Sequence, residues 1–231
     1  MLNHQWILSA RPTPGPLTTK IFSLEESALP AVAPGEYLVK VEWLSFDPTQ
    51  RMWMTADTYV PKIPIGSVVR SLGLGTVMAS QNRSFPVGAR VVGLLGWQEY
   101  ALRDGKDLFP DTVIPREVEP TAALSVFGLT GLTAYFGMVD VGAVKPGDVV
   151  AVSGAAGATG SIAAQVAKNL GASKVIGIAG GADKCRWLTE KAHLDAAIDY
   201  KSDDVAAKLR ELAPHGIDLY FDNVGGSTLD I

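Results

Sequence analysis

The feature that most constrains this fold is a run of β-branched residues that breaks into glycines and then enters a helical pattern. Residues 149–160 read Val-Val-Ala-Val-Ser-Gly-Ala-Ala-Gly-Ala-Thr-Gly. A strand, a glycine turn and a helix in this order predict a phosphate-binding turn. Glycine permits the tight turn, and the free N–H groups at a helix N-terminus attract anions. An ordinary tight turn is the alternative for so short a pattern.

The residues that follow continue the alternation of helix and strand. Residues 162–170 carry an apolar stripe at helical spacing, and 205–212 form a second helical pattern. Strands are expected at 175–178, 196–200 and 217–221. Strands separated by helices of this length indicate a parallel sheet with right-handed crossovers. The sequence therefore predicts a Rossmann domain, whose usual ligand is a dinucleotide.

The end of the second strand indicates which nicotinamide cofactor this domain prefers. NAD sites place Asp or Glu about 20 residues past the glycines, where the acid holds the ribose 2′-hydroxyl. Here that position is Gly180, and Lys184 follows in the first turn of the next helix, within reach of a 2′-phosphate. The missing acid favours NADP(H). Two alternatives stay open: a ribose contact by Asp183, and a purely solvated role for Lys184.

Composition excludes several classes of function for this chain of 231 residues. A formal charge of −4 without a basic run gives no sign of a nucleic-acid surface. Cys185 is the single cysteine and the three histidines are scattered, so neither a disulfide framework nor a metal site is expected. The N-terminus lacks the pattern of a signal peptide, which favours a cytoplasmic protein.

One uncharged segment, residues 120–139, approaches the length that spans a membrane. Glycine and threonine interrupt it repeatedly, and a turn at residues 145–148 soon follows. We therefore expect packed helices at a domain junction and no contact with a membrane.

The chain before about residue 120 has a different pattern. Residues 37–44 alternate with a period of two, as a strand does. Further short strands are expected at 75–79, 89–94 and 98–102, with turns of Pro and Gly between them. This pattern predicts a small, irregular β-barrel ahead of the Rossmann domain.

Six short motifs follow one another along almost the whole chain, at residues 47–51, 96–100, 128–135, 155–160, 179–185 and 221–226. In this order they resemble the zinc-independent prostaglandin, 2-alkenal and curcumin reductases of the medium-chain dehydrogenase/reductase superfamily. The resemblance implies an α/β protein with a GroES-like catalytic domain at 1–127 and an NADP-binding Rossmann domain at 128–231. Such a sheet has about six strands, and four are expected here, so the Rossmann domain is expected to be incomplete and truncated at its C-terminus.

The resemblance also implies an activity. It is the NADPH-dependent reduction of a carbon–carbon double bond conjugated to a carbonyl, without zinc, in a small-molecule substrate. A homodimer is implied as well. Two other functions remain open at this point: a non-catalytic NADPH-binding protein, and an NADPH quinone reductase of the same superfamily.

Cofactor-binding residues carry over from the family by position. The expected pyrophosphate contacts are the turn residues Gly154, Ala156, Gly157, Ala158, Thr159 and Gly160. Lys184 is expected at the 2′-phosphate, Tyr200 near the adenosine end and Asn223 on the nicotinamide side. A strand-end aromatic is the alternative for Tyr200, and an ordinary turn residue is the alternative for Asn223.

The catalytic group is expected at Tyr59, which matches a tyrosine of curcumin-reductase-like members. Thr49 stands where several relatives carry a tyrosine, so a phenol is missing there. Tyr59 would bind the carbonyl oxygen or supply a proton, with core packing as the alternative. Asp47 and Arg51 are expected to form a structural pair.

Overall fold

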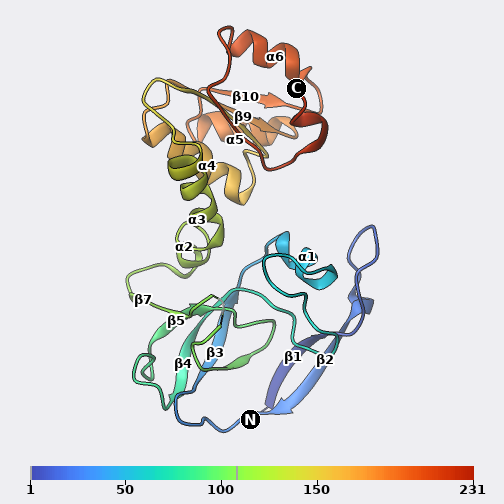
Figure 1. The fold of residues 1–231 in the computed structure, drawn as a ribbon, viewed down its shortest axis with the longest axis vertical. Helices are drawn as coiled ribbons and strands as arrows, with labels where there is room; N and C mark the ends of the chain where they lie inside the picture. The colour runs from blue at the N-terminus through green and yellow to red at the C-terminus, as the bar shows by residue number, and fades with distance from the viewer. Residues whose placement is uncertain (1, 108) are drawn as a thin grey trace. The chain divides into compact units, whose positions relative to one another are not determined.

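The computed structural model describes residues 2–107 and 109–231, and the chain divides into two compact units between Leu124 and Ser125 (Figure 1). This division lies a few residues before the expected domain boundary at residue 127. The functional boundary itself stays a prediction.

The first unit is organised around antiparallel strands. A five-stranded sheet has the order β6-β3-β4-β5-β7. Its strands are β3 (Tyr37–Leu44), β4 (Gly73–Ser80), β5 (Arg90–Gly93), β6 (Tyr100–Arg103) and β7 (Thr112–Ile114). The four strands expected from the sequence coincide with β3 to β6, so their prediction is confirmed.

A second, two-stranded ladder was not foreseen. It pairs β1 (Leu2–Leu8) with β2 (Phe22–Ala28), and a short 3-10 helix at Thr19–Ile21 precedes β2. Isolated bridges from Gln5 to Gln98 and from Ile7 to Val68 tie this ladder to the rest of the unit. The expected barrel is therefore built from two sheets joined by single bridges.

A short helix packs against the two-stranded ladder and neighbouring loops. In α1 (Thr49–Thr55) the side chains of Trp53 and Met54 are buried, and they pack with Leu8, Val60 and other apolar residues. Burial of this kind contributes about 25 cal/mol per Å² of apolar area.

The residues that begin α1 do not form the expected pair. Arg51 donates to the carbonyl of Thr13 (2.8 Å), and Asp47 accepts from the hydroxyl of Ser45 (2.8 Å). Within the described residues no ion pair joins Asp47 to Arg51. The expectation of a structural pair was wrong: Asp47 bonds to Ser45, two residues away, whereas Arg51 bonds to the carbonyl of Thr13, which lies 38 residues away along the chain.

A buried charge network lies at the edge of the five-stranded sheet. The fully buried carboxylate of Asp111 accepts two bonds from Arg103, both 2.9 Å, and one from the Tyr37 hydroxyl at 2.5 Å. Asp107 contacts the same guanidinium from a more exposed position. Burial raises the pKa of Tyr37, and the Asp111 hydrogen bond adds to this. Burial alone would lower the pKa of Arg103, but its bonds to Asp111 and Asp107 raise it overall.

An exposed histidine links the two sheets of the first unit. The Nδ1 atom of His4 lies 2.6 Å from Glu99, and its Nε2 atom lies 3.3 Å from Glu26. The hydrogen bond to Glu99 and its charge raise the pKa of His4 above 6.5. The same hydrogen bond lowers the pKa of Glu99 below 4.5.

These shifts predict a pH-dependent contribution to stability. The His4 contribution is full below its unfolded pKa and is lost as pH rises through the folded one. The Glu99 contribution is lost as pH falls through its folded pKa. We expect His4→Asn to lower the free energy of unfolding at about pH 5.5 and to change it little at about pH 9. Denaturant titrations at the two pH values measure the difference, and an equal loss at both would contradict the linkage.

The uncharged segment near residue 120 is helical, as expected. It holds α2 (Pro120–Leu124), α3 (Leu129–Phe136) and a π-helical turn at Gly137–Val141. Among the described residues, no helix has the length and apolar character needed to cross a membrane.

The second unit contains a parallel sheet of order β10-β9-β8-β11. Its strands are β8 (Val149–Ser153), β9 (Lys174–Ala179), β10 (Ala196–Asp199) and β11 (Leu219–Phe221). They alternate with α4 (Ala158–Asn169), α5 (Ala182–Glu190) and α6 (Val205–Leu212), and a 3-10 helix at Gly226–Thr228 follows β11. All four expected strands and the Rossmann-like sheet are confirmed.

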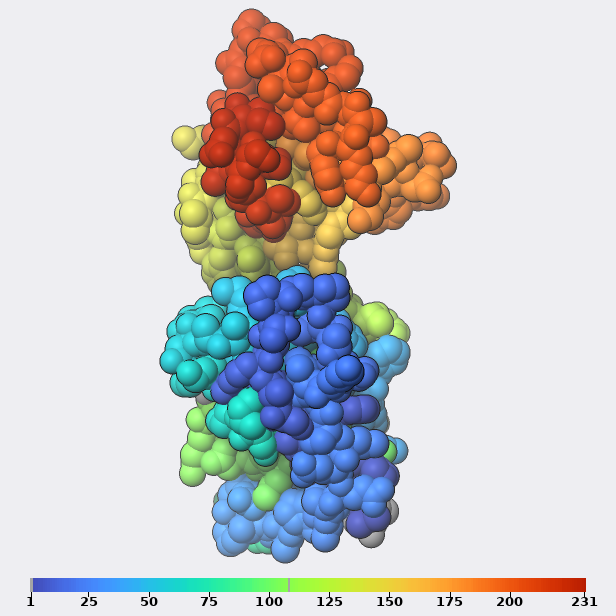
Figure 2. Space-filling view, turned by 90° about the vertical axis from the view of Figure 1, so that its right-hand side faces the viewer, coloured from blue at the N-terminus to red at the C-terminus, as the bar shows by residue number. Residues whose placement is uncertain are grey.

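Helices cover both faces of this sheet (Figure 1). Alanines of α4 and Leu188 of α5 pack with Val150, Val152 and Val175 on one face. Val205 and Leu209 of α6 pack with the isoleucines of β9 and β10 on the other. Figure 2 shows the end of the chain, in red, beside the orange residues that include α6, and the two segments line a common cavity. The helices α4 and α5 lie on one face and α6 lies on the other, because the chain returns from β10 across the sheet to the far side of β8. The direction of strand order therefore reverses between β8 and β11, and this is the topological switch point.

Candidate functional site

The site lies where the carboxyl ends of β8 and β11 meet. Parallel sheets bind ligands at such a switch point, because the flanking loops diverge there and leave a crevice. Ser153 ends β8, and its hydroxyl donates to Asp222 (2.8 Å) after β11. Asn223 donates to the Ser153 hydroxyl and, through its side chain, to the Ser153 carbonyl, both at 2.8 Å. These bonds hold the two loops together.

The loop after β8 exposes a row of backbone donors. Gly154 has φ +55°, and a Cβ atom at Gly160 would lie 2.4 Å from the Gly154 carbonyl oxygen, so the turn requires glycine at both positions. Gly157 precedes α4 without a side-chain cap. Within the described chain, the N–H groups of Ala158, Thr159 and Gly160 have no acceptor. Such free donors at a helix N-terminus are suited to a phosphate group.

A cavity of about 260 Å³ opens beside this turn. Four of the expected binding residues line it: Gly154, Ala156, Lys184 and Tyr200. It is also lined by Gly180, Val224 and Thr228. Asn223 is tied to Ser153, which also lines the cavity. Residues expected from separate motifs are thus brought to one place.

Lys184 and Asp183 have different surroundings in the structure. Lys184 lines the cavity, and among the described residues no carboxylate lies within ion-pair distance of it. Asp183 is 94% exposed and pairs with Arg186 at 3.3 Å. Of the two adjacent side chains, the cation therefore lines the cavity and the acid pairs on the surface. This arrangement favours a dinucleotide that carries a 2′-phosphate in addition to its pyrophosphate.

Tyr200 occupies the space where an NAD-type acid would stand. A Cβ atom at Gly180 would lie 2.7 Å from the Tyr200 ring, and the Tyr200 N–H donates to the carbonyl of Ala179 (3.1 Å). The glycine is therefore required for close approach of the aromatic ring. The position of the Tyr200 ring and the lack of an acid at Gly180 are therefore linked, because the ring occupies the space that a side chain at Gly180 would need.

Sequence reasoning missed two carboxylates that shape the site. Asp199 accepts from the N–H groups of Gly181 (2.8 Å) and Lys201 (3.0 Å), which lowers its pKa. Asp222 accepts from the N–H of Gly225 (3.0 Å) as well as from Ser153, and its pKa is also lowered. Each ends a strand beside a glycine loop, and this placement is the signal that could have identified them.

The first unit brings two other expected residues together. The hydroxyl of Tyr59 lies 3.3 Å from that of Thr49 at the start of α1. The Tyr59 side chain is 62% exposed, and its ring makes edge contacts with Trp53 and Phe109. A side chain this exposed does not fit the core-packing alternative. The pair can offer hydroxyl hydrogen bonds to a carbonyl oxygen.

Two family models match the chain. The model described as N-terminal domain of oxidoreductase covers residues 4–110, and the one described as zinc-binding dehydrogenase covers residues 158–231. NADPH-dependent curcumin reductase of Escherichia coli is 36% identical over 229 residues, which cover 99% of this chain and 65% of that protein. Bovine prostaglandin reductase 1 is 38% identical over 216 residues, which cover 90% of this chain and 62% of that protein.

Solved structures agree with these matches. CurA from Vibrio vulnificus in complex with NADPH has a TM-score of 0.89 and 39% identity, over 98% of this chain and 66% of that one. The chain thus spans about two thirds of the length of the relatives it matches.

The description of the second family model names zinc, and the residues present do not fit a zinc site. Structural and catalytic zinc need three or four Cys, His or acidic ligands at one point. Cys185 is the only cysteine of the chain. Across residues 2–107 and 109–231, no group of three or more such side chains could hold a metal.

Proposed function

This chain belongs to the medium-chain dehydrogenase/reductase superfamily and matches its curcumin and prostaglandin reductases, and we propose that it functions as an NADPH-dependent reductase. The substrates are small molecules with a carbon–carbon double bond conjugated to a carbonyl. The reaction proceeds without zinc.

The main support for this proposal is one cavity, which is lined by Gly154 and Ala156 of the glycine turn together with Lys184 and Tyr200. The N–H groups at the start of α4 fit a pyrophosphate, and the ammonium of Lys184 fits a 2′-phosphate; among the described residues these groups have no acceptor and no carboxylate partner, respectively. Tyr200 lines the same cavity as Lys184, and we assign it to the adenosine end. Asn223, which is bonded to Ser153 at the switch point, is assigned to the nicotinamide side. NADPH, when bound, supplies a hydride to the β-carbon of the substrate.

The remaining chemistry belongs to the side chains. Negative charge develops on the substrate carbonyl oxygen as the enolate forms, and hydrogen-bond donors lower the energy of that state. Tyr59 is the proposed donor, and Thr49 holds its hydroxyl in place. Protonation at the α-carbon completes the reaction.

Tyr59→Phe should lower kcat for an enal by about two- to tenfold. That is the net value of one hydrogen bond, and water can replace the phenol because the side chain is largely exposed. NADPH affinity should not change. Thr49→Ala, which removes only the partner hydroxyl, should have a smaller effect. Stopped-flow turnover with both variants measures kcat and KM separately, and an unchanged kcat in Tyr59→Phe would exclude its catalytic role.

The proposed activity is tested by NADPH oxidation with three acceptors. An alkenal, a quinone and no acceptor are compared by the decrease in NADPH absorbance. Faster oxidation with the alkenal than with the quinone supports the proposal. Preference for the quinone would indicate a quinone reductase, and NADPH binding without oxidation by either acceptor would indicate a non-catalytic nucleotide-binding protein.

We also propose a homodimer and a cytoplasmic location. The lone cysteine, which cannot form an internal disulfide, suits a reducing compartment. The homodimer rests on the family resemblance. Light scattering on the purified chain measures its mass in solution, and a monomer over the working concentration range would contradict the dimer.

A further inference from the structure

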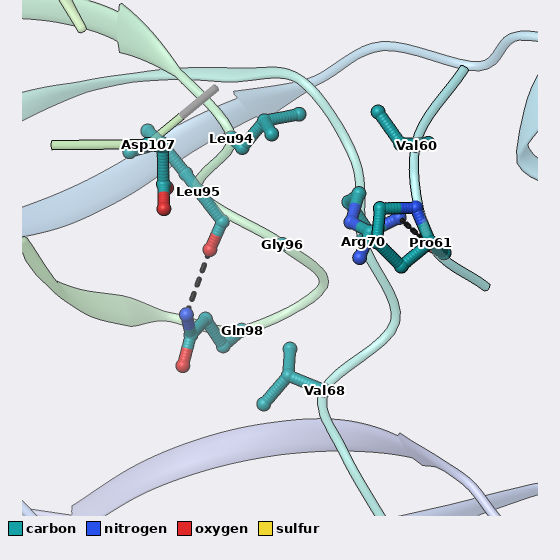
Figure 3. Close-up of a pocket in the computed structure, with 9 residues that line it drawn as sticks. All are labelled: Val60, Pro61, Val68, Arg70, Leu94, Leu95, Gly96, Gln98 and Asp107. Atoms are coloured by element: carbon teal, nitrogen blue, oxygen red, sulfur yellow. Dashed lines mark hydrogen bonds between the residues drawn. The ribbon is translucent and has the colours of Figure 1, made fainter. Parts of the chain in front are cut away.

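A second cavity lies wholly within the first unit. It has a volume of about 260 Å³ and is formed by the loop after α1, the segment before β4 and the connection from β5 to β6 (Figure 3). Most of its walls are apolar, with Val60, Val68 and Leu95 among the residues that line it. This volume is below the roughly 300–1,000 Å³ of sites for drug-sized ligands. The cavity therefore accommodates either a small molecule or one end of a larger one.

One arginine stands out in this apolar lining. Arg70 donates to the carbonyl of Pro61 (2.8 Å), and its guanidinium carbon lies 5.9 Å from the centre of the Trp53 ring. These contacts fix the side chain but use only one of its five N–H groups. Among the described residues, no carboxylate lies within ion-pair distance of Arg70.

The acidic residue of the described lining, Asp107, forms an ion pair with an arginine outside the cavity. Asp107 lies on the wall opposite Arg70 in Figure 3, and its carboxylate pairs with Arg103. Gln98, which also lines the cavity, donates to the Leu95 carbonyl at 2.7 Å and accepts from Gln5 at 2.7 Å. Among the described residues that line the cavity, Arg70 has the largest number of N–H groups without an acceptor. Burial lowers its pKa, and the charge of Asp107 opposes that shift.

We propose that this cavity binds a small aliphatic carboxylate. The planar fork of a guanidinium matches the two oxygens of a carboxylate, which accept parallel hydrogen bonds from it. The alkyl part of the ligand would lie against Val60, Val68 and Leu95. This assignment does not involve the nucleotide, because the glycine turn, Lys184 and Tyr200 line a different cavity.

The experiment compares hexanoate with hexanamide, which has the same shape without the charge. Both are titrated into the whole chain without nucleotide, and binding is followed by calorimetry and by shifts of the amide resonances. Hexanoate should bind more tightly than hexanamide. Arg70→Gln should weaken hexanoate binding at least about tenfold and leave hexanamide binding unchanged. Retained hexanamide binding shows that the variant cavity is still formed.

Two further variants sharpen the test. Arg83→Gln makes the same change at an exposed arginine outside the cavity and should alter neither affinity. Asp107→Asn removes the negative charge opposite Arg70 and should strengthen hexanoate binding. The proposal is overturned if neither probe binds at millimolar concentration, if both bind equally, or if Asp107→Asn weakens hexanoate binding.

Discussion

Replacing Asp111 with alanine should lower the free energy of unfolding by about 3–5 kcal/mol, the usual cost of removing one partner from a buried ion pair. The Asp111 carboxylate is fully buried and accepts from both Arg103 and Tyr37. Its loss leaves the phenol of Tyr37 without this acceptor and a largely buried guanidinium with only the peripheral Asp107. Equilibrium denaturation followed by fluorescence measures the change.

Asp107→Ala is the matched control for that variant. Asp107 contacts the same guanidinium, but its side chain is 44% exposed. Its removal should therefore cost no more than about 1 kcal/mol, as for a surface pair. Similar losses in the two variants would show that burial does not strengthen the Asp111 pair.

Replacing Lys184 with alanine should weaken NADPH binding by about ten- to a hundredfold, since a charge-assisted hydrogen bond contributes about 1.5–3 kcal/mol. NADH lacks the 2′-phosphate, so its affinity should barely change. The reason is structural: Lys184 lines the cavity and no described carboxylate neutralises it. Titrations of both nucleotides against the wild type and the variant give the two ratios.

Lys191→Ala provides the control in the same region of the chain. Lys191 follows the last residue of α5, is exposed and does not line the cavity. It should leave both affinities unchanged. Equal losses of NADH and NADPH binding in Lys184→Ala would mean that the lysine acts through folding rather than through the phosphate.

An acid inserted at Gly180 should change nucleotide binding in two ways, by its charge and by moving the Tyr200 ring. Any side chain there displaces the Tyr200 ring, whose atoms lie 2.7 Å from the position of a Cβ. Gly180→Ala measures the effect of this displacement without a charge. The difference between Gly180→Asp and Gly180→Ala then isolates repulsion of the 2′-phosphate by the carboxylate.

Local patterns sufficed for much of the fold. The period-2 alternation of residues 37–44 predicted β3 with the bounds that the structure shows. By contrast, β2 reads Phe-Ser-Leu-Glu-Glu-Ser-Ala and is largely exposed, so it carries no comparable burial signal. Its pairing with β1 depends on cross-strand contacts that a linear pattern does not reveal.

The same distinction applies to the candidate site. Short motifs were enough to single out the glycine turn and Lys184, and the structure brings Gly154, Ala156 and Lys184 to one cavity. Asp199 and Asp222 act through hydrogen bonds to Gly181 and Ser153, which lie 18 and 69 residues away along the chain. Only the folded sheet brings those strand ends together.

The strand order of the second unit also has a consequence for folding during synthesis. β8 pairs with β9 and β9 pairs with β10, in the order in which these strands are made. β11 is made last and pairs with the free side of β8. The ribosome makes about 5–20 residues per second, so the 69 residues from Ser153 to Asp222 take roughly 3–14 seconds. Through that interval the open edge of β8 can pair with a neighbouring nascent chain. Slow translation of this region should therefore increase the demand for chaperones.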